Sequence, residues 1–176
     1  MKPIAAFFWR RLDHPGHDSC RVFKMRRGSR LSGVAVFWDK HKPCHFQYEV
    51  EADEKWRTRS ASVVGYLGNK AIDLSISSSQ GGGWMVGSEL QDRFTDCIDV
   101  DLRRLALRIG EQAQAPAVYL SFPKMRFERL PQTYRRISRT QYEYEASSVG
   151  YAGTLRVLAS GAVAHYPDLF ELVTSG

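Results

Sequence analysis

The chain has 176 residues, of which 43% are hydrophobic, 12% aromatic and 25% charged, and this composition excludes disordered, collagen-like and coiled-coil proteins. At this length we predict a single β-barrel domain over residues 1–176, large enough to bury a core without disulfides or a structural metal ion. The 25 lysines and arginines outnumber the 19 aspartates and glutamates, and the formal net charge of +6 is compatible with anionic partners.

The N-terminal apolar run extends from Ile4 to Trp9 and is followed at once by Arg10 and Arg11. A secretory signal peptide usually contains about 7–15 apolar residues before a small-residue cleavage site, so this run is too short. The three cysteines form no Cys-x-x-Cys pair, which is typical of reduced thiols. We therefore expect a cytoplasmic protein.

Alternation of apolar and polar residues recurs along the chain and predicts β-strands. It is clearest from Cys44 to Ala52, and weaker versions occur at 72–76, 118–122 and 141–145. Turn signals such as Gly68-Asn69 separate these runs, a pattern typical of an antiparallel sandwich or barrel. Because register fixes which side of a strand is dry, we expect Phe46 to Val50 to present one face to a continuous apolar interior.

One segment, from Asp99 to Gln112, has helical spacing instead. Its apolar residues recur at intervals of three and four, at Leu102, Leu105, Ala106 and Ile109. We predict a single short helix here, which either plugs one end of a barrel or forms a basic surface helix that touches lipid. At the start of a helix, Asp99 and Asp101 are favourable charges; in an extended segment they share a face and could form an acid/base couple.

No complete motif for catalysis, metal binding or nucleotide binding is present. The segments His14–His17 and His41–His45 contain metal-ligand residue types, but Cys44 and His45 point to opposite faces of a strand. The serines lack a nucleophile-elbow sequence, and Gly81-Gly82-Gly83 suits a hairpin turn better than a phosphate loop. Because no complete cofactor motif is present, we expect no cofactor. Acidic residues are mixed with the basic ones, so we expect no nucleic-acid partner.

Five motifs occur in a recognisable order: Trp56-Arg57-Thr58-Arg59, Gly83-Trp84, Cys97-Ile98-Asp99-Val100-Asp101-Leu102, Gln132-Thr133-Tyr134-Arg135-Arg136, and Gly161-Ala162-Val163 with Tyr166-Pro167-Asp168-Leu169-Phe170. Together they resemble a family of bacterial proteins described as putative glycolipid-binding, which is similar in fold to the lipoprotein carriers of the Lol system. The resemblance implies a mainly β fold: an antiparallel, partly open β-barrel that holds a lipid or glycolipid in a central apolar cavity.

The candidate ligand-binding residues are Tyr48, Trp56, Arg57, Arg59, Trp84, Asp99, Asp101, Tyr134, Arg135 and Tyr166. For the two tryptophans, packing at a barrel end is favoured over contact with the ligand. We expect the two arginines of the first motif to share a sheet face, and at least one to pair with Asp99 or Asp101. Along a strand Tyr134 and Arg135 point to opposite faces, and we expect Tyr134 inward and Arg135 outward.

The resulting hypothesis is a non-catalytic protein that binds a lipid or glycolipid and transiently contacts anionic membrane surfaces. Two alternatives remain open. The first is a hydrolase or isomerase that acts on a hydrophobic substrate with Asp99 and Asp101 in its pocket. The second is a protein-interaction module.

Overall fold

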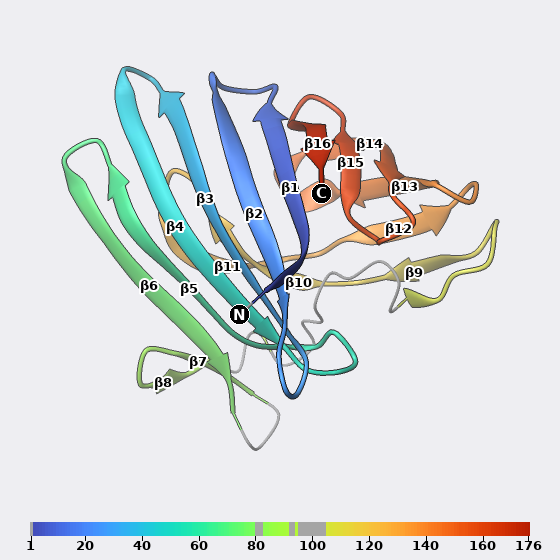
Figure 1. Cartoon of the computed structure of the whole chain (residues 1–176), viewed down its shortest axis with the longest axis horizontal. Helices are drawn as coiled ribbons and strands as arrows, with labels where there is room; N and C mark the ends of the chain where they lie inside the picture. The colour runs from blue at the N-terminus through green and yellow to red at the C-terminus, as the bar shows by residue number, and fades with distance from the viewer. Residues whose placement is uncertain (1, 80–82, 92–93, 95–104) are drawn as a thin grey trace. The chain divides into compact units, whose positions relative to one another are not determined.

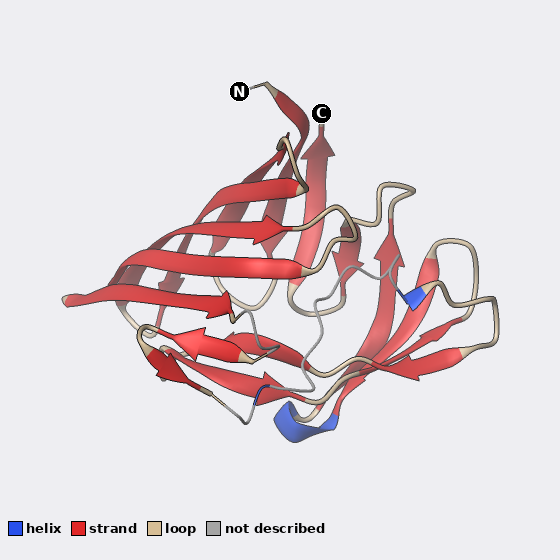
Figure 2. Cartoon of the chain, turned by 90° about the horizontal axis from the view of Figure 1, so that it is seen from below, coloured by secondary structure: helices blue, strands red, loops and turns tan. Residues whose placement is uncertain are grey.

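The computed structural model describes residues 2–79, 83–91, 94 and 105–176, most of which lie in β-strands (Figure 1, Figure 2). The chain forms two compact units. Residues 1–92 with 169–176 make up the large unit, and residues 93–168 make up the small unit. Every strand pair described in either unit is antiparallel, which confirms the mainly β, antiparallel fold.

The large unit is a single open sheet with the strand order β8-β7-β6-β5-β4-β3-β2-β1-β16. Its strands are β1 (Pro3–Arg11), β2 (Gly16–Lys24), β3 (Ser29–Asp39), β4 (Lys42–Ala52), β5 (Thr58–Leu67), β6 (Lys70–Ser78), β7 (Trp84–Val86), β8 (Glu89–Leu90) and β16 (Phe170–Ser175). Strands that follow one another in the chain from β1 to β8 are neighbours in the sheet. Among the described residues of this unit, the strand pairing that joins distant parts of the chain is that of β1 with β16.

Alternation along these strands gives the sheet an apolar face. This face carries the buried side chains Phe7, Cys20, Val22, Phe37, Cys44, Phe46, Ile72 and Ile76. The strand predicted from Cys44 to Ala52 lies within β4, and its dry residues are on this face as expected. Phe46 is buried, while Tyr48 and Val50 are half-buried. That these residues line a cavity remains a prediction.

The small unit contains an antiparallel sheet with the order β15-β14-β13-β12-β9, and a separate hairpin of β10 and β11. The elements are β9 (Gln112–Gln114), β10 (Ala117–Ser121), β11 (Arg126–Leu130), β12 (Thr133–Arg136), β13 (Gln141–Ala146), the short 3-10 helix η3 (Ser147–Val149), β14 (Tyr151–Val157) and β15 (Val163–Tyr166). Tyrosines that alternate with glutamates in β13 point into a core that also contains Leu107, Leu155 and Val157.

The helix predicted over 99–112 is wrong for the part that the structure describes. Residues 99–104 lie outside the described residues, and from Leu105 onward the chain turns and enters β9. Ala106 has a φ of 47°, which no α-helix contains. The backbone here bonds to Arg136 instead: the guanidinium Nη1 donates to the carbonyl of Leu107 at 2.9 Å, and the Gly110 N–H donates to the Arg136 carbonyl at 2.7 Å. These contacts bury Leu107 without a helix.

Candidate functional site

The centre of the apolar face is less covered than its ends. Cross-strand register aligns Cys20, Gly33, Tyr48, Val63 and Leu74 in one row, and Val22, Leu31, Val50, Ala61 and Ile76 in the next. In both rows the residues of β2 are buried, whereas those at the middle of β4 and β5 are half-buried. The sheet therefore presents a half-buried apolar surface there, and partly exposed apolar surfaces of this kind often mark interaction sites.

A polar pair interrupts this apolar surface. The Tyr48 hydroxyl donates a hydrogen bond of 2.7 Å to Oδ1 of Asp18 on β2, two residues from the buried Cys20. Burial raises the pKa of the Asp18 carboxyl, although Tyr48 and the more distant Arg11 act in the opposite direction. Burial also raises the pKa of the Tyr48 phenol. The site therefore offers a phenol and a carboxyl group that retains its proton to higher pH than usual.

Glycine at position 33 makes the Tyr48–Asp18 contact possible. Gly33 pairs with Tyr48 across β3 and β4, and the tyrosine ring lies over it to reach β2 on the far side. A Cβ at position 33 would stand 2.3 Å from Tyr48 Cζ and 2.8 Å from the Ser19 carbonyl oxygen. Only glycine therefore leaves room for the ring in this position.

The raised pKa of Asp18 predicts how stability depends on pH. Between the ordinary aspartate pKa of about 3.9 and the raised folded value, the folded state binds the proton more strongly than the unfolded chain does. Deprotonation therefore favours unfolding, and we expect the free energy of unfolding to fall as pH rises through this window. Asp18→Asn keeps an oxygen that accepts the Tyr48 hydrogen bond, so this contribution to the pH dependence should disappear.

Urea unfolding between pH 4 and pH 8 measures this effect, with the exposed Asp73→Asn as the matched control. Asp18→Asn should gain stability relative to wild type as pH increases, while Asp73→Asn should follow wild type. Identical pH profiles for wild type and Asp18→Asn would contradict the raised pKa.

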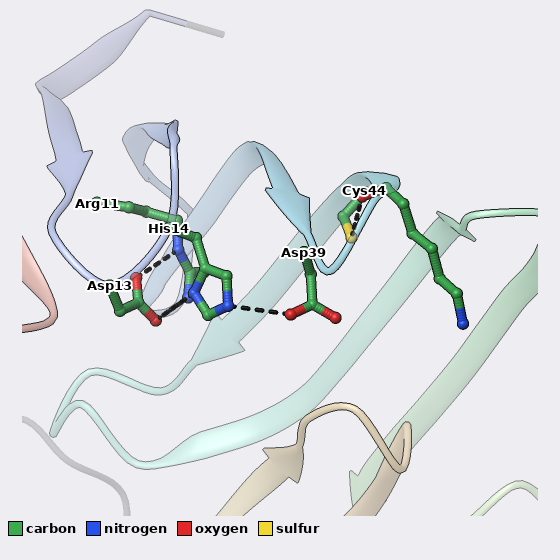
Figure 3. Close-up of polar contacts among 6 residues, drawn as sticks. Arg11, Asp13, His14, Asp39 and Cys44 are labelled. Carbon is green, nitrogen blue, oxygen red and sulfur yellow. Dashed lines mark hydrogen bonds and ion pairs between the residues drawn. The ribbon is translucent and has the colours of Figure 1, made fainter.

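A second polar network lies at the end of the same sheet, where the β1–β2 turn meets the end of β3 (Figure 3). Arg11 binds Asp13 through Nε and Nη2, at 3.0 and 2.6 Å, and its guanidinium lies 4.1 Å above the Phe37 ring. His14 lies between two carboxylates, with Nδ1 2.9 Å from Asp13 and Nε2 3.0 Å from the buried Asp39. Burial raises the pKa of Asp13, but the hydrogen bonds from Arg11 and His14 outweigh burial and lower it overall. These contacts connect β1 and the β1–β2 turn to the end of β3.

The residues predicted from the sequence are spread over both units. Tyr48 belongs to the apolar face, and Trp84 is buried at the start of β7, where packing was the favoured interpretation. Trp56 occupies a turn with a φ of 59°, and Arg57 and Arg59 are exposed. Asp99 and Asp101 lie outside the described residues, so their pairing with an arginine and any acid/base role remain predictions.

The expected orientation of Tyr134 and Arg135 is confirmed. Tyr134 is 3% exposed, while Arg135 is exposed and forms an ion pair of 3.2 Å with Glu143 on β13. The Tyr134 hydroxyl is bound within the core of the small unit: it donates to Oε1 of Gln132 at 3.0 Å. The same oxygen accepts the Tyr144 hydroxyl at 2.8 Å, and Tyr144 in turn accepts a hydrogen bond from Tyr166.

This network makes Tyr134 and Tyr166 parts of the small unit's core. Gln132 is buried and donates from Nε2 to the Ala115 carbonyl at 3.3 Å, which fixes the side-chain oxygen between the two phenols. Burial raises the pKa of Tyr134 and Tyr166, so both hydroxyls remain protonated donors. A ligand role for these tyrosines remains a prediction, whereas their packing role is visible.

Two pockets lie within single units. In the large unit, a pocket of about 260 Å³ lies over β4, β5, β6 and β7, and its polar lining consists of Glu49, Glu51, Ser60, Ser62, Ser75 and Ser77. In the small unit, a pocket of about 180 Å³ is lined by Gln114, Pro116, Arg129, Pro131, Gln132, Thr133, Glu145 and Ser147. Both pockets are predominantly polar, so neither is the apolar cavity expected from the sequence.

Within the part of the chain that the structure describes, no cluster of three or more His, Cys, Asp or Glu residues is arranged to hold a metal ion. The described helical segments include none with the length and apolar character of a membrane span. Cys20 and Cys44 are both buried free thiols. Burial raises the pKa of the Cys20 thiol and thereby disfavours the nucleophilic thiolate.

Sequence reasoning missed Asp18, Gly33 and Gln132. Asp18 precedes Cys20 by two residues and Val22 by four in an alternating run. The alternation therefore places its carboxyl group on the same apolar face of the strand as these two side chains. Gly33 lies inside an otherwise strand-like run, which often marks a close approach of another group. Gln132 carries no comparable signal, because two of its partners, Ala115 and Tyr144, are distant in the sequence.

Comparisons with known proteins agree with this architecture. A family model described as putative glycolipid-binding matches residues 6–171. The solved structure of a DUF1089 family protein from Pseudomonas aeruginosa is similar with a TM-score of 0.73 and 23% sequence identity, over 88% of this chain and 91% of that one. At this identity the likeness concerns the fold. No curated protein sequence matches the chain.

Proposed function

The chain belongs to the putative glycolipid-binding family, and from this premise we propose that it binds a glycolipid whose acyl part lies on the apolar face of the large unit. The observation that carries the proposal is the half-buried centre of that face around Leu31, Val50, Val63 and Leu74, with the Tyr48–Asp18 pair among apolar neighbours. Apolar area supplies affinity for such a ligand, and a few polar groups orient it. Phenol and carboxyl groups can hydrogen-bond the ester, amide or hydroxyl groups where acyl chains join the head group.

We propose binding rather than turnover. Nucleophilic catalysis needs an activated nucleophile beside a base, whereas burial raises the pKa of the Cys20 thiol near this pair and so disfavours its nucleophilic thiolate. The alternative of a hydrolase or isomerase relies on Asp99 and Asp101, which lie outside the described residues. Incubation with long-chain glycosides and esters, followed by mass spectrometry, separates the two proposals, because any product formed by the purified protein contradicts the binding proposal.

The test of acyl binding is calorimetry with alkyl glucosides of six to ten carbons, below their micelle concentrations. Each buried methylene contributes about 0.8 kcal/mol, so the dissociation constant should fall roughly fourfold per added carbon. Val50→Asp, on the apolar face, should abolish this dependence. Val64→Asp, at an exposed position of the opposite face, should preserve it.

Two outcomes would contradict the proposal. Affinity independent of chain length would mean that the acyl part is not bound, and equal losses in both aspartate variants would mean that the apolar face is not involved. A parallel series with alkyl phosphocholines tests whether the protein recognises the sugar head group. The same affinity for both head groups would mean that the protein binds acyl chains without recognising a sugar.

A further inference from the structure

Asp18 places a carboxyl group within the apolar face of the large unit. Register puts it in one row with Trp9 of β1, Ala35 of β3 and Phe46 of β4. Cys20 lies two residues further along β2, on the same face. Asp18 is half-buried, so a ligand that covers this face removes water from its carboxyl group and has to supply a hydrogen-bond partner in place of that water.

The group that bonds to Asp18 is a phenol rather than a cation. Tyr48 donates to its Oδ1 at 2.7 Å, whereas the guanidinium of Arg11 bonds to Asp13 and acts on Asp18 only at a distance. The Cys20 thiol donates to a backbone carbonyl oxygen of its own strand at 3.7 Å. The other titratable or charged groups that β2, β3, β4 and the β1–β2 turn bring to this face lie towards its ends, and they are Lys24, Asp39, Lys42, Cys44 and His14.

The hydrogen bond from Tyr48 determines what this pair offers to a ligand. A phenol has one proton to donate, and Tyr48 donates it to Oδ1 of Asp18. While Asp18 is ionised, the pair therefore has only acceptors left, and the carbonyl oxygen of a ligand finds no donor there. When Asp18 is protonated, its second oxygen carries a proton that can be donated to such a carbonyl. Burial raises the pKa of the Asp18 carboxyl, so this protonated form persists to higher pH than in an ordinary aspartate.

We propose that Asp18, held by Tyr48, is a proton-dependent hydrogen-bond donor that selects ligands whose acyl chain joins the head group through an ester carbonyl. The inference rests on the proposed function, because it assigns the ligand class of the same apolar face. An ether-linked chain of equal length buries nearly the same apolar area but has no carbonyl oxygen to accept the proton of Asp18. The preference for the ester is therefore present where Asp18 is protonated, and it is lost as pH rises and Asp18 ionises.

Calorimetry with octyl glucoside and 1-O-octanoyl-glucose, between pH 4 and pH 7, tests the proposal. The two probes share the sugar and the chain length and differ by one carbonyl oxygen, so the ratio of their dissociation constants isolates the hydrogen bond to that oxygen. Wild type should prefer the ester roughly two- to tenfold at pH 4, and the two affinities should converge as pH approaches 7. Titration of His14, at the end of the sheet, should affect both probes alike and leave the ratio unchanged.

Asp18→Asn separates the donor from the charge. Its amide keeps an oxygen for the Tyr48 hydroxyl and has an N–H group that donates at every pH, so the preference for the ester should persist from pH 4 to pH 7. Asp73→Asn, at an exposed position of the opposite face, is the matched control and should follow wild type.

Tyr48→Phe tests the second member of the pair. It removes the hydrogen bond that stabilises the ionised carboxylate, so the pH at which the preference for the ester is lost should move upward. Tyr66→Phe, which changes an exposed tyrosine on the opposite face, should leave the profile where it is in wild type.

A wild-type ratio that is the same at pH 4 and pH 7 would overturn the proposal, and this measurement requires no variant to fold. Loss of the ester preference in a folded Asp18→Asn protein, or an unshifted pH profile in a folded Tyr48→Phe protein, would also contradict it. Affinity that depends on chain length without a preference for the ester would leave acyl binding intact and overturn this inference alone. Affinity that is independent of chain length would contradict the proposed function and this inference together.

Discussion

Replacing Gln132 with leucine is expected to lower the free energy of unfolding by about 2–6 kcal/mol. The oxygen of Gln132 accepts hydrogen bonds from both Tyr134 and Tyr144, and both phenols are buried. Leucine fills a similar volume but leaves two buried hydroxyls without this acceptor, at about 1–3 kcal/mol each. Chemical denaturation measures the loss, and the exposed Gln112→Leu on β9 is the control.

A mutant cycle isolates the hydrogen bonds from the packing. In a Tyr134→Phe/Tyr144→Phe background, the Gln132→Leu change should be much less harmful, because no hydroxyl is left without a partner. If the loss is the same in both backgrounds, the glutamine stabilises the small unit by its shape, and the hydrogen bonds contribute little.

Gly33→Ala is expected to destabilise the protein by about 1–3 kcal/mol and to weaken binding of alkyl glucosides roughly three- to tenfold. The added methyl group overlaps the Tyr48 ring, which must move and release Asp18. Combining Gly33→Ala with Tyr48→Ser should recover part of the stability. The remainder comes from the overlap with the Ser19 carbonyl oxygen, which no side-chain change relieves.

Ser32→Ala is the matched control, because Ser32 adjoins Gly33 on β3 and points to the opposite face. It should leave both stability and ligand affinity near wild type. Wild-type affinity in a folded Gly33→Ala protein would show that the Tyr48–Asp18 pair has no part in ligand binding.

The sequence predicted the strands well because alternation is a local property. The run from Cys44 to Ala52 requires no knowledge of its neighbours, and the outward position of Arg135 follows from the inward position of Tyr134. The segment after Leu105 was predicted wrongly, because its conformation depends on contacts with a distant residue. Its spacing fits a helix, yet its backbone groups bond to Arg136, a residue about thirty positions further along the chain.

The candidate site was only partly predictable for the same reason. Tyr48 could be placed on a dry face, but its partner Asp18 is brought close by the register of β2, β3 and β4 together. The exposed Val36 and Tyr66 likewise lie near each other only because both pair with His45 of β4. Alternation identifies the face on which a residue lies, whereas its neighbours depend on how several strands align.

The pairing of β1 with β16 has a consequence for how the protein is made. Arg10 bonds to Glu171, 161 positions later, and the backbone of Ala6 exchanges two hydrogen bonds with Gly176. At about 5–20 residues per second, a ribosome needs roughly 8–30 s to synthesise the residues between these strands. Throughout that time β2 can already pair with β1, while the other edge of β1 has no partner from its own chain. The nascent chain is thus expected to carry an open strand edge, which is able to pair with another chain until β16 has been synthesised.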